Sequence, residues 1–226
     1  MINFLLPIMV FAPIVMGFAP LFIKDLKKLN LSIVALCIVE FVLCGWLFVT
    51  NHHYEGMVVA VNWFSGLGVQ FEINGLGILQ ALATSIIWVG SSVFSDEYFD
   101  HDKTYLHRYY AFFCVTFGAT LGIFLAYDLF TVFVFFEVMS FASYALVAHN
   151  QDADSIAAGN SYLTVAVLGG LVVLMGIFML NSIAGTLVIS QLQQACAPYV
   201  GTPALYATGF MIFFGFAAKA GMFPLH

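Results

Sequence analysis

Residues 132–146 read VFVFFEVMSFASYAL, and Glu137 is the single charged side chain in this largely apolar run. Ser140 and Tyr144 follow three and seven residues later, so the three polar side chains share one face of a helix. A charged group near the bilayer centre costs at least ~2.5–3.5 kcal/mol, and such residues usually face a bundle interior or an ion pathway. The stretch therefore predicts a membrane helix whose Glu–Ser–Tyr face turns toward protein and water. The alternative for Glu137 is a neutral acid that hydrogen-bonds a neighbouring backbone group.

The whole chain has the composition of a membrane protein. Of its 226 residues, 62% are hydrophobic and 8% are charged, and the mean hydropathy is +1.01. A soluble domain of this composition would have a largely apolar surface. A membrane helix needs roughly 20 mostly apolar residues, and about seven stretches qualify: 4–23, 31–50, 76–94, 110–127, 129–148, 162–181 and 205–222. Because the alternating pattern of an outer-membrane barrel is absent, we predict an all-α membrane protein with about seven transmembrane helices.

The basic residues predict how the chain is oriented. Lys24, Lys27 and Lys28 follow the first apolar stretch, and Lys103 and Arg108 follow the third. If the helices alternate, both groups lie on one side, which the positive-inside rule assigns to the cytoplasm, with the N-terminus outside. No basic residue precedes the first stretch, which favours an uncleaved helix over a signal peptide. We therefore predict a multi-pass protein of the cytoplasmic membrane.

Two predicted outer loops are long. The loop 51–75 contains MVVAVNWFSGLGVQFEING, in which strand-forming residues flank a possible turn at 65–68, so we expect a small β-hairpin after the second helix. The loop 182–203 contains ISQLQQACAPYV, a candidate short surface helix. We divide the chain into a two-helix region with its hairpin loop, 1–75, and a transmembrane bundle, 76–226.

A second charge lies in the last apolar stretch, GFAAKAGMFPLH at 215–226. Lys219 is the single basic residue in any of the apolar stretches. Pro224 lacks an N–H, and its ring clashes with the carbonyl of Ala220, so we expect the helix to break just after the lysine. Broken helices at membrane depth are tolerated where they line a cavity. The alternative is a lysine near a helix end whose ammonium group snorkels to the interface.

Four further polar residues are weaker candidates. Glu40 lies midway along the second stretch without a polar stripe of its own, and it is either a contact to another subunit or a locally satisfied buried acid. Thr116 and Thr120 share a face of the fourth helix and could supply hydroxyl groups near Glu137. Asp128 precedes the fifth helix, where an N-cap is the better interpretation.

No pattern predicts a cofactor or a metal. Metal-ligand spacing is absent among the four cysteines: Cys37, Cys44, Cys114 and Cys196. Nucleotide-binding, nucleophile-elbow and haem-attachment motifs are also absent. The sequence favours a conduit over a chemical active site, and it carries no signal for nucleic-acid binding.

Three segments resemble one known family. YDLFTVFVFFEVMSFASYAL and GFAAKAGMFPLH are similar to the fifth and seventh helices of the antiporter-like membrane subunits, and DEYFDHDKTYLHRYYAFF is similar to the loop and helix before them. Such subunits occur in respiratory complex I, which is an NADH dehydrogenase of the respiratory chain, in Mrp-type sodium/proton antiporters and in membrane-bound hydrogenases. The resemblance is strongest from residue 75 to residue 226.

The resemblance implies a function for the two charges. Glu137 matches the family's acid on helix five, and Lys219 matches the lysine on its broken seventh helix. In the family, these two residues form a coupled pair in a proton path. The family fold has two inverted repeats, whereas this sequence covers the first and stops within the broken helix. The expected partners are therefore other membrane subunits. Two interpretations of the second half stay open: either a separate chain carries it, or the sequence is a truncated part of a longer one.

Three functional hypotheses remain open at this stage. The first is an ion-translocating subunit, moving protons or sodium ions, within a redox-driven or antiporter complex and without redox chemistry of its own. The second is a structural subunit, or split half, that only stabilises its neighbours. The third is an independent small transporter, which the absence of a second repeat disfavours because such transporters usually place their site between repeats.

Overall fold

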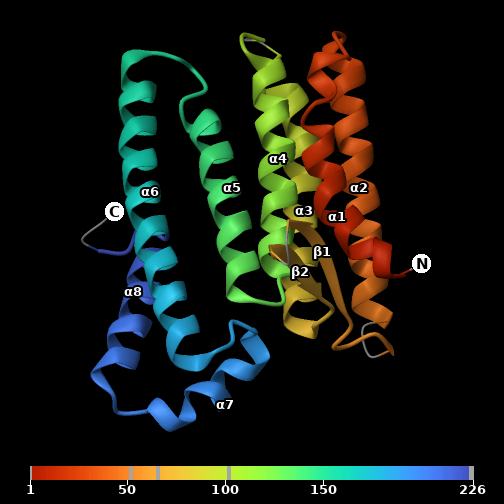
Figure 1. Cartoon of the computed structure of the whole chain (residues 1–226). Helices are drawn as coiled ribbons and strands as arrows, with labels where there is room; N and C mark the ends of the chain where they lie inside the picture. Colours follow the sequence, from red (N-terminus) through yellow and green to blue (C-terminus); the bar gives the residue numbers. More distant parts are fainter. Residues whose placement is uncertain (1, 51–52, 65–66, 101–102, 224–226) are drawn as a thin grey trace.

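The structure is a computed structural model that describes residues 2–50, 53–64, 67–100 and 103–223. Within them, seven helices of 15 to 32 residues run roughly side by side, as Figure 1 shows. They are α1 (Ile2–Met16), α2 (Leu26–Thr50), α3 (Gly75–Tyr98), α4 (Leu106–Phe124), α5 (Leu129–Val147), α6 (Ala153–Ala184) and α8 (Pro203–Lys219). Each predicted apolar stretch overlaps one of these helices. By length and composition, five segments could cross a membrane: Phe4–Leu21, Leu26–Thr50, Gly75–Tyr98, Leu129–Val147 and Ala153–Ala184.

Local capping explains where several helices begin. The side chains of Asn74, Asp128, Asp152 and Thr202 each accept a hydrogen bond from the backbone N–H three residues later. Each cap satisfies one of the N–H groups that a helix start leaves without an intrahelical partner. The cap at Asp152 moves the start of α6 to Ala153, nine residues before the apolar stretch predicted at 162–181. The predicted N-cap at Asp128 is present.

The predicted hairpin lies at one end of the helix bundle. Strand β1 (Val58–Phe64) pairs antiparallel with β2 (Leu67–Glu72), and the expected turn residues 65 and 66 lie outside the described part of the chain. The Glu72 N–H donates to the Leu125 carbonyl at 2.8 Å, and the Tyr127 N–H donates to Gln70 at 2.9 Å. The hairpin is therefore fixed to the turn between α4 and α5.

The connection between α6 and α8 reaches the same end. It contains the 3₁₀ turn η3 (Ile189–Gln191), the short helix α7 (Leu192–Cys196) and the turn η4 (Ala197–Tyr199), which agrees with the predicted surface helix. The Ile189 N–H donates to the Tyr127 carbonyl at 3.2 Å, and the Leu129 N–H donates to Leu187 at 3.0 Å. The loops after α2, α4 and α6 thus form one connected end of the bundle.

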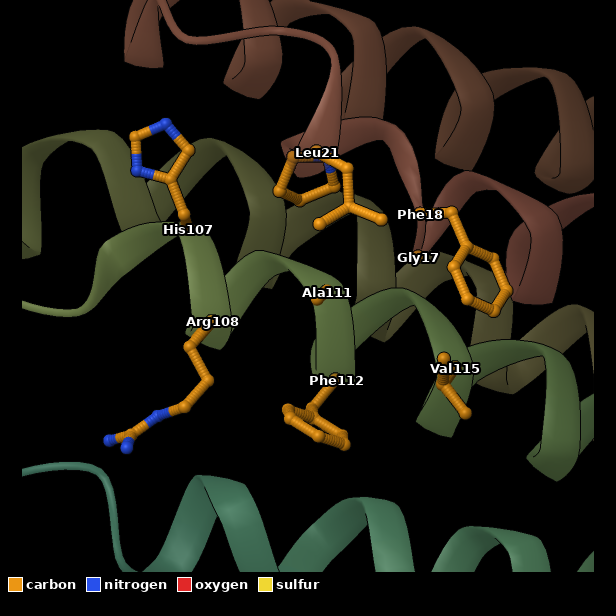
Figure 2. Close-up of a pocket in the computed structure, with 9 residues that line it drawn as sticks. Gly17, Phe18, Leu21, His107, Arg108, Ala111, Phe112 and Val115 are labelled. Atoms are coloured by element: carbon orange, nitrogen blue, oxygen red, sulfur yellow. The ribbon is translucent and has the colours of Figure 1, made fainter.

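The loops after α1, α3 and α5 meet at the opposite end. His107 Nε2 is 3.2 Å from the carbonyl oxygen of Lys24, and an Arg108 Nη atom donates to the carbonyl of His149 at 2.7 Å. Both predicted basic groups therefore lie at one end, the "basic end" below. A groove of about 390 Å³ lies at this end. Figure 2 shows how Gly17 and Phe18 in this groove face Ala111 and Val115 on α4.

Candidate functional site

Glu137 is the ninth of the 19 residues of α5, so it lies at the middle of that helix. The helix is anchored at its start by Asp128, which accepts hydrogen bonds from the backbone N–H and the hydroxyl of Thr131 at 2.9 and 2.8 Å. The Thr131 oxygen also accepts the N–H of Gln70 from the hairpin at 2.9 Å. These bonds fix the depth of α5, and therefore of Glu137, relative to the hairpin end.

The carboxylate of Glu137 turns toward α6. A Cβ atom added at Gly170 would collide with Glu137 Oε1, so the missing side chain of this glycine makes room for the acid. Oε1 is buried and has no hydrogen-bond partner among the described residues. An unpaired carboxylate oxygen inside a membrane protein is costly and indicates a position kept for a charge or a proton.

Lys219 ends α8 beside the same two helices. Its Nζ atom is buried, has no described hydrogen-bond partner, and lies 4.7 Å from the ring centroid of Phe136 and 5.6 Å from that of Tyr162. Both distances are within the range of a cation–π contact. Lys219 Nζ thus lies against α5 and α6 within the protein, which favours the interior position over snorkelling.

The charges of Glu137 and Lys219 interact without forming a direct ion pair. Each side chain interacts electrostatically with the other. No distance between Lys219 Nζ and a carboxylate oxygen of Glu137 is within the 4.0 Å limit of a salt bridge. Tyr162 on α6 borders this pair, because its ring lies 5.6 Å from Lys219 Nζ and its side chain interacts with Glu137 and Ser143 on α5. The site therefore combines an acid from α5, a phenol from α6 and an amine from α8.

Helix α8 ends at Lys219, and a cavity borders the lysine there. The Met222 N–H donates to Ala217 at 3.0 Å and the Gly221 N–H donates to Ala218 at 3.3 Å, with Gly221 at φ +65°. This is a Schellman motif, in which glycine adopts the left-handed conformation after a helix end. Helix α8 therefore ends at Lys219, and the left-handed conformation of Gly221 accounts for this end. The sequence analysis attributed the break to Pro224, which lies outside the described residues. A cavity of about 300 Å³ adjoins Lys219, Tyr162 and Gly221.

The hydroxyl groups of the other predicted site residues have different hydrogen-bond partners. The Ser140 hydroxyl donates to the Phe136 carbonyl at 2.6 Å, and the Tyr144 hydroxyl donates to Asn160 Oδ1 at 3.4 Å. The Thr120 hydroxyl donates to the Thr116 carbonyl at 2.8 Å and approaches Met139 Sδ at 3.6 Å. Among the described residues, none of these four hydroxyl groups forms a hydrogen bond with Glu137 Oε1.

Glu40 is 1% exposed and lies inside the bundle on α2. Its Oε2 has no hydrogen-bond partner in the described part of the chain. The described residues hold no group of three metal-ligating side chains.

Sequence reasoning missed Tyr162 and Phe136, and it gave Gly170 no role beside Glu137. A lone tyrosine in the apolar run of α6 was a signal for Tyr162. The roles of Phe136 and Gly170 depend on which helices touch, and the local sequence does not reveal this.

Comparisons with known proteins match this fold and part of this sequence. The sequence profile of the family NADH:quinone oxidoreductase/Mrp antiporter, TM matches residues 126–226, which include Glu137 and Lys219. The D-type subunit of the Na(+)/H(+) antiporter of Alkalihalophilus pseudofirmus is 26% identical over 225 residues, covering 98% of this chain and 45% of that protein. A putative antiporter subunit mnhA2 of Staphylococcus aureus is 28% identical over 183 residues, covering 79% of this chain and 22% of that protein. The chain thus spans less than half the length of these relatives.

Solved structures share the fold. A chain of the Mrp complex from Dietzia aligns with a TM-score of 0.83 and 21% identity, covering 100% of this chain and 42% of that one. A chain of the archaeal membrane-bound sulfane sulfur reductase gives 0.84 and 20%, covering 98% and 46%, and one of Thermus thermophilus respiratory complex I gives 0.79 and 20%, covering 98% and 45%.

The chain is a membrane protein with several apolar helices, and residues 126–226 match the profile of the NADH:quinone oxidoreductase/Mrp antiporter, TM family. In sequence it is similar to the D-type and A-type subunits of Na(+)/H(+) antiporters.

Proposed function

We propose that this chain is an ion-translocating subunit of a multisubunit membrane complex, and that Glu137 and Lys219 carry the translocated proton. The observation that carries the proposal is the placement of both groups. Glu137 Oε1 and Lys219 Nζ are buried without hydrogen-bond partners among the described residues, on separate helices, within reach of each other's charge. A structural ion pair would be satisfied by direct contact, whereas a relay needs groups that can gain and lose a partner.

The proposed mechanism is electrostatic. Because the two charges lie beyond 4.0 Å, their attraction at an effective dielectric constant of about 20 stays below about 4 kcal/mol. This coupling is strong enough that a charge change nearby alters proton binding, yet weak enough that either group can be neutralised. A proton delivered to Glu137 weakens the hold on the Lys219 charge, and the lysine then releases its own proton into the adjoining cavity. The chain needs no redox centre for these steps. Sodium is the alternative coupled ion.

The proposed topology places the N-terminus outside in the cytoplasmic membrane, with seven membrane-spanning helices. The meeting of the loops after α1, α3 and α5 at the basic end supports it, because Lys24, Lys27, Lys28, Lys103 and Arg108 then share the cytoplasmic side. Helices α4 and α8 are the two long helices outside the set of five candidate spans. They would cross by packing against α5 and α6.

Other membrane subunits are the proposed partners. The solved relatives named above are more than twice as long as the aligned region. We propose that further helices, on this polypeptide or on a separate one, pack beside α8 and complete the ion path beyond Lys219. The outward side chains of Phe210 and Phe213, 65% and 60% exposed, give α8 an apolar surface for such contact.

The replacement Glu137→Gln tests the proposal, because it keeps the shape of the side chain and removes its charge. In inverted membrane vesicles that contain the assembled complex, we expect normal amounts of the chain and a loss of coupled ion transport. Glu55→Gln, at an exposed glutamate near the hairpin, is the matched control and should leave transport unchanged. Full transport by assembled Glu137→Gln would favour a purely structural subunit instead.

A further inference from the structure

A second polar feature runs along the interface between α2 and α3. The buried residues of α2 include positions 30, 33, 37, 40, 44 and 47, and those of α3 include 78, 81, 85, 92 and 95, both with steps of three, four or seven. Such spacing gives two matching stripes. Two pairs of side chains lie near each other across this seam, Cys37 with Ser92 and Cys44 with Ser85.

Glu40 lies between these two crossing pairs. It is 1% exposed, and within the described part of the chain its Oε2 has no hydrogen-bond partner and no charged group interacts with it. The titratable side chains near this seam are Cys37 and Cys44 on α2 and Cys114, Tyr109 and Tyr110 on α4, while α1 offers none within the described residues. A buried carboxylate without a cation is too costly to stay ionised, so this position must hold a proton or a bound cation.

The neighbours of Glu40 favour the proton. A bound metal cation needs several oxygen ligands, as calcium and magnesium sites illustrate. The hydroxyls of Ser85 and Ser92 donate to the carbonyls of Leu82 and Val89 at 2.8 and 2.9 Å, and the remaining partners across the seam are thiols. Thiols and hydroxyls can pass a proton, but they make a poor oxygen cage.

A polar cavity opens the seam at the basic end. It measures about 610 Å³, and its lining includes the charged groups of Lys27, Asp96, Glu97, Asp100 and Lys103. We name it the acidic vestibule, because three of these five residues are acids. The seam therefore begins at a charged cavity that can exchange protons with water.

Small polar side chains connect the vestibule with Glu40. Ser95, next to Asp96, lies 3.3 Å from the Tyr109 hydroxyl, and Ser92 follows one helical turn deeper. On α2, the buried Asn30 has an Oδ1 atom without a described partner at the same end. From Lys27 to Glu40 the rise is about 20 Å along the helix axis. Polar groups thus recur from the vestibule to the acid.

We propose that Glu40 is a second proton-binding site, reached from the acidic vestibule along the α2–α3 seam. Helix α4 stands between this seam and α5, as Figure 1 shows, so the site is separate from the Glu137–Lys219 pair. The inference stands independently of the proposed function, since a proton on Glu40 requires neither Glu137 nor Lys219.

Infrared difference spectroscopy on the full-length protein in native membranes tests the proposal. A protonated carboxylic acid has a C=O stretching band above those of carboxylates, and the band shifts down when the proton is replaced by deuterium. We expect one such band to disappear in Glu40→Gln, to move in Glu40→Asp, and to persist in Glu137→Gln. In D₂O the wild-type band should shift, and Ser92→Val should slow that shift several-fold.

Two controls decide the route and the ligand. Ser91→Ala, one residue away and on a different helix face, should leave the exchange rate unchanged. Replacing choline chloride with sodium chloride at constant ionic strength should leave the Glu40 band in place, and its loss in sodium would show a cation site and overturn the proposal. The absence of any band sensitive to Glu40→Gln would also overturn it, as would a band that never exchanges.

Discussion

Gly170→Ala moves the carboxylate of Glu137 without changing any charge. The added Cβ would lie 2.8 Å from Glu137 Cδ and 3.0 Å from Oε2, and closer still to Oε1, whereas ordinary contacts begin at 3.4 Å. The carboxylate must therefore retreat by at least 3.4 − 2.8 = 0.6 Å, measured at Cδ. A misplacement of order 1 Å in a reacting group can cost up to about 100-fold in rate. We expect coupled transport to fall ~10- to 100-fold.

Assembly should survive this change for two reasons. The clashing atoms are the end of a flexible side chain, which can rotate away. Alanine also favours a helix over glycine by roughly 0.5–1 kcal/mol. Immunoblots of membranes and co-purification of partner subunits measure assembly, and dye quenching in inverted vesicles measures transport.

Gly209→Ala on α8 is the matched control, since a Cβ there meets nothing within 4 Å. It brings the same helix preference without a clash and should transport like the wild type. If fully assembled Gly170→Ala also transports normally, the position of the Glu137 carboxylate is unimportant and the reasoning fails. If assembly is lost, the double variant Gly170→Ala/Glu137→Ala should restore it, because it removes the clashing group.

Three further predictions follow from the described contacts. Lys219→Arg keeps a positive charge on a group that does not release its proton. If Lys219 carries a proton, both Lys219→Arg and Lys219→Ala should lose coupled transport. If Lys219 is only an electrostatic anchor, Lys219→Arg should retain most of the transport activity. In topology mapping, a reporter fused after Lys28 should read cytoplasmic and one fused near Asn62 external, and the reverse result would invert the proposed orientation. Hydrogen bonds from the backbone N–H and side chain of Ser155 hold the pKa of Asp152 below its usual range. The resulting stabilisation of α6 is complete above the unfolded-state pKa and is lost as the pH falls through the folded-state pKa, so Asp152→Ala should flatten the acid limb of a pH-dependent thermal-unfolding curve measured in detergent.

The sequence by itself determined the class of protein and its main elements. Apolar runs of membrane length, a strand–turn–strand loop and a cap such as Asp128 depend on residues close together in the sequence. They can therefore be predicted without knowing the tertiary contacts. The same holds for Glu137 and Lys219, because a charge in an apolar run is visible without a structure. Helix boundaries were less accurate. Helix α6 begins at Ala153 because a capped polar turn extends an apolar helix, and hydropathy alone does not register that turn.

Only the tertiary structure decided which faces meet. In a membrane, lipid and protein interior are equally apolar, so hydrophobic periodicity does not mark the buried side of a helix. The sequence placed Ser140 and Tyr144 on the face of Glu137, yet Ser140 bonds its own helix and Tyr144 bonds Asn160. The groups that surround the Glu137–Lys219 pair, Phe136 and Tyr162, became apparent only once α5, α6 and α8 were packed. Glu40 likewise could have faced a neighbouring subunit, and the packing of α2 against α3 is what buries it without a partner among the described residues, because burial is a property of the contact between helices.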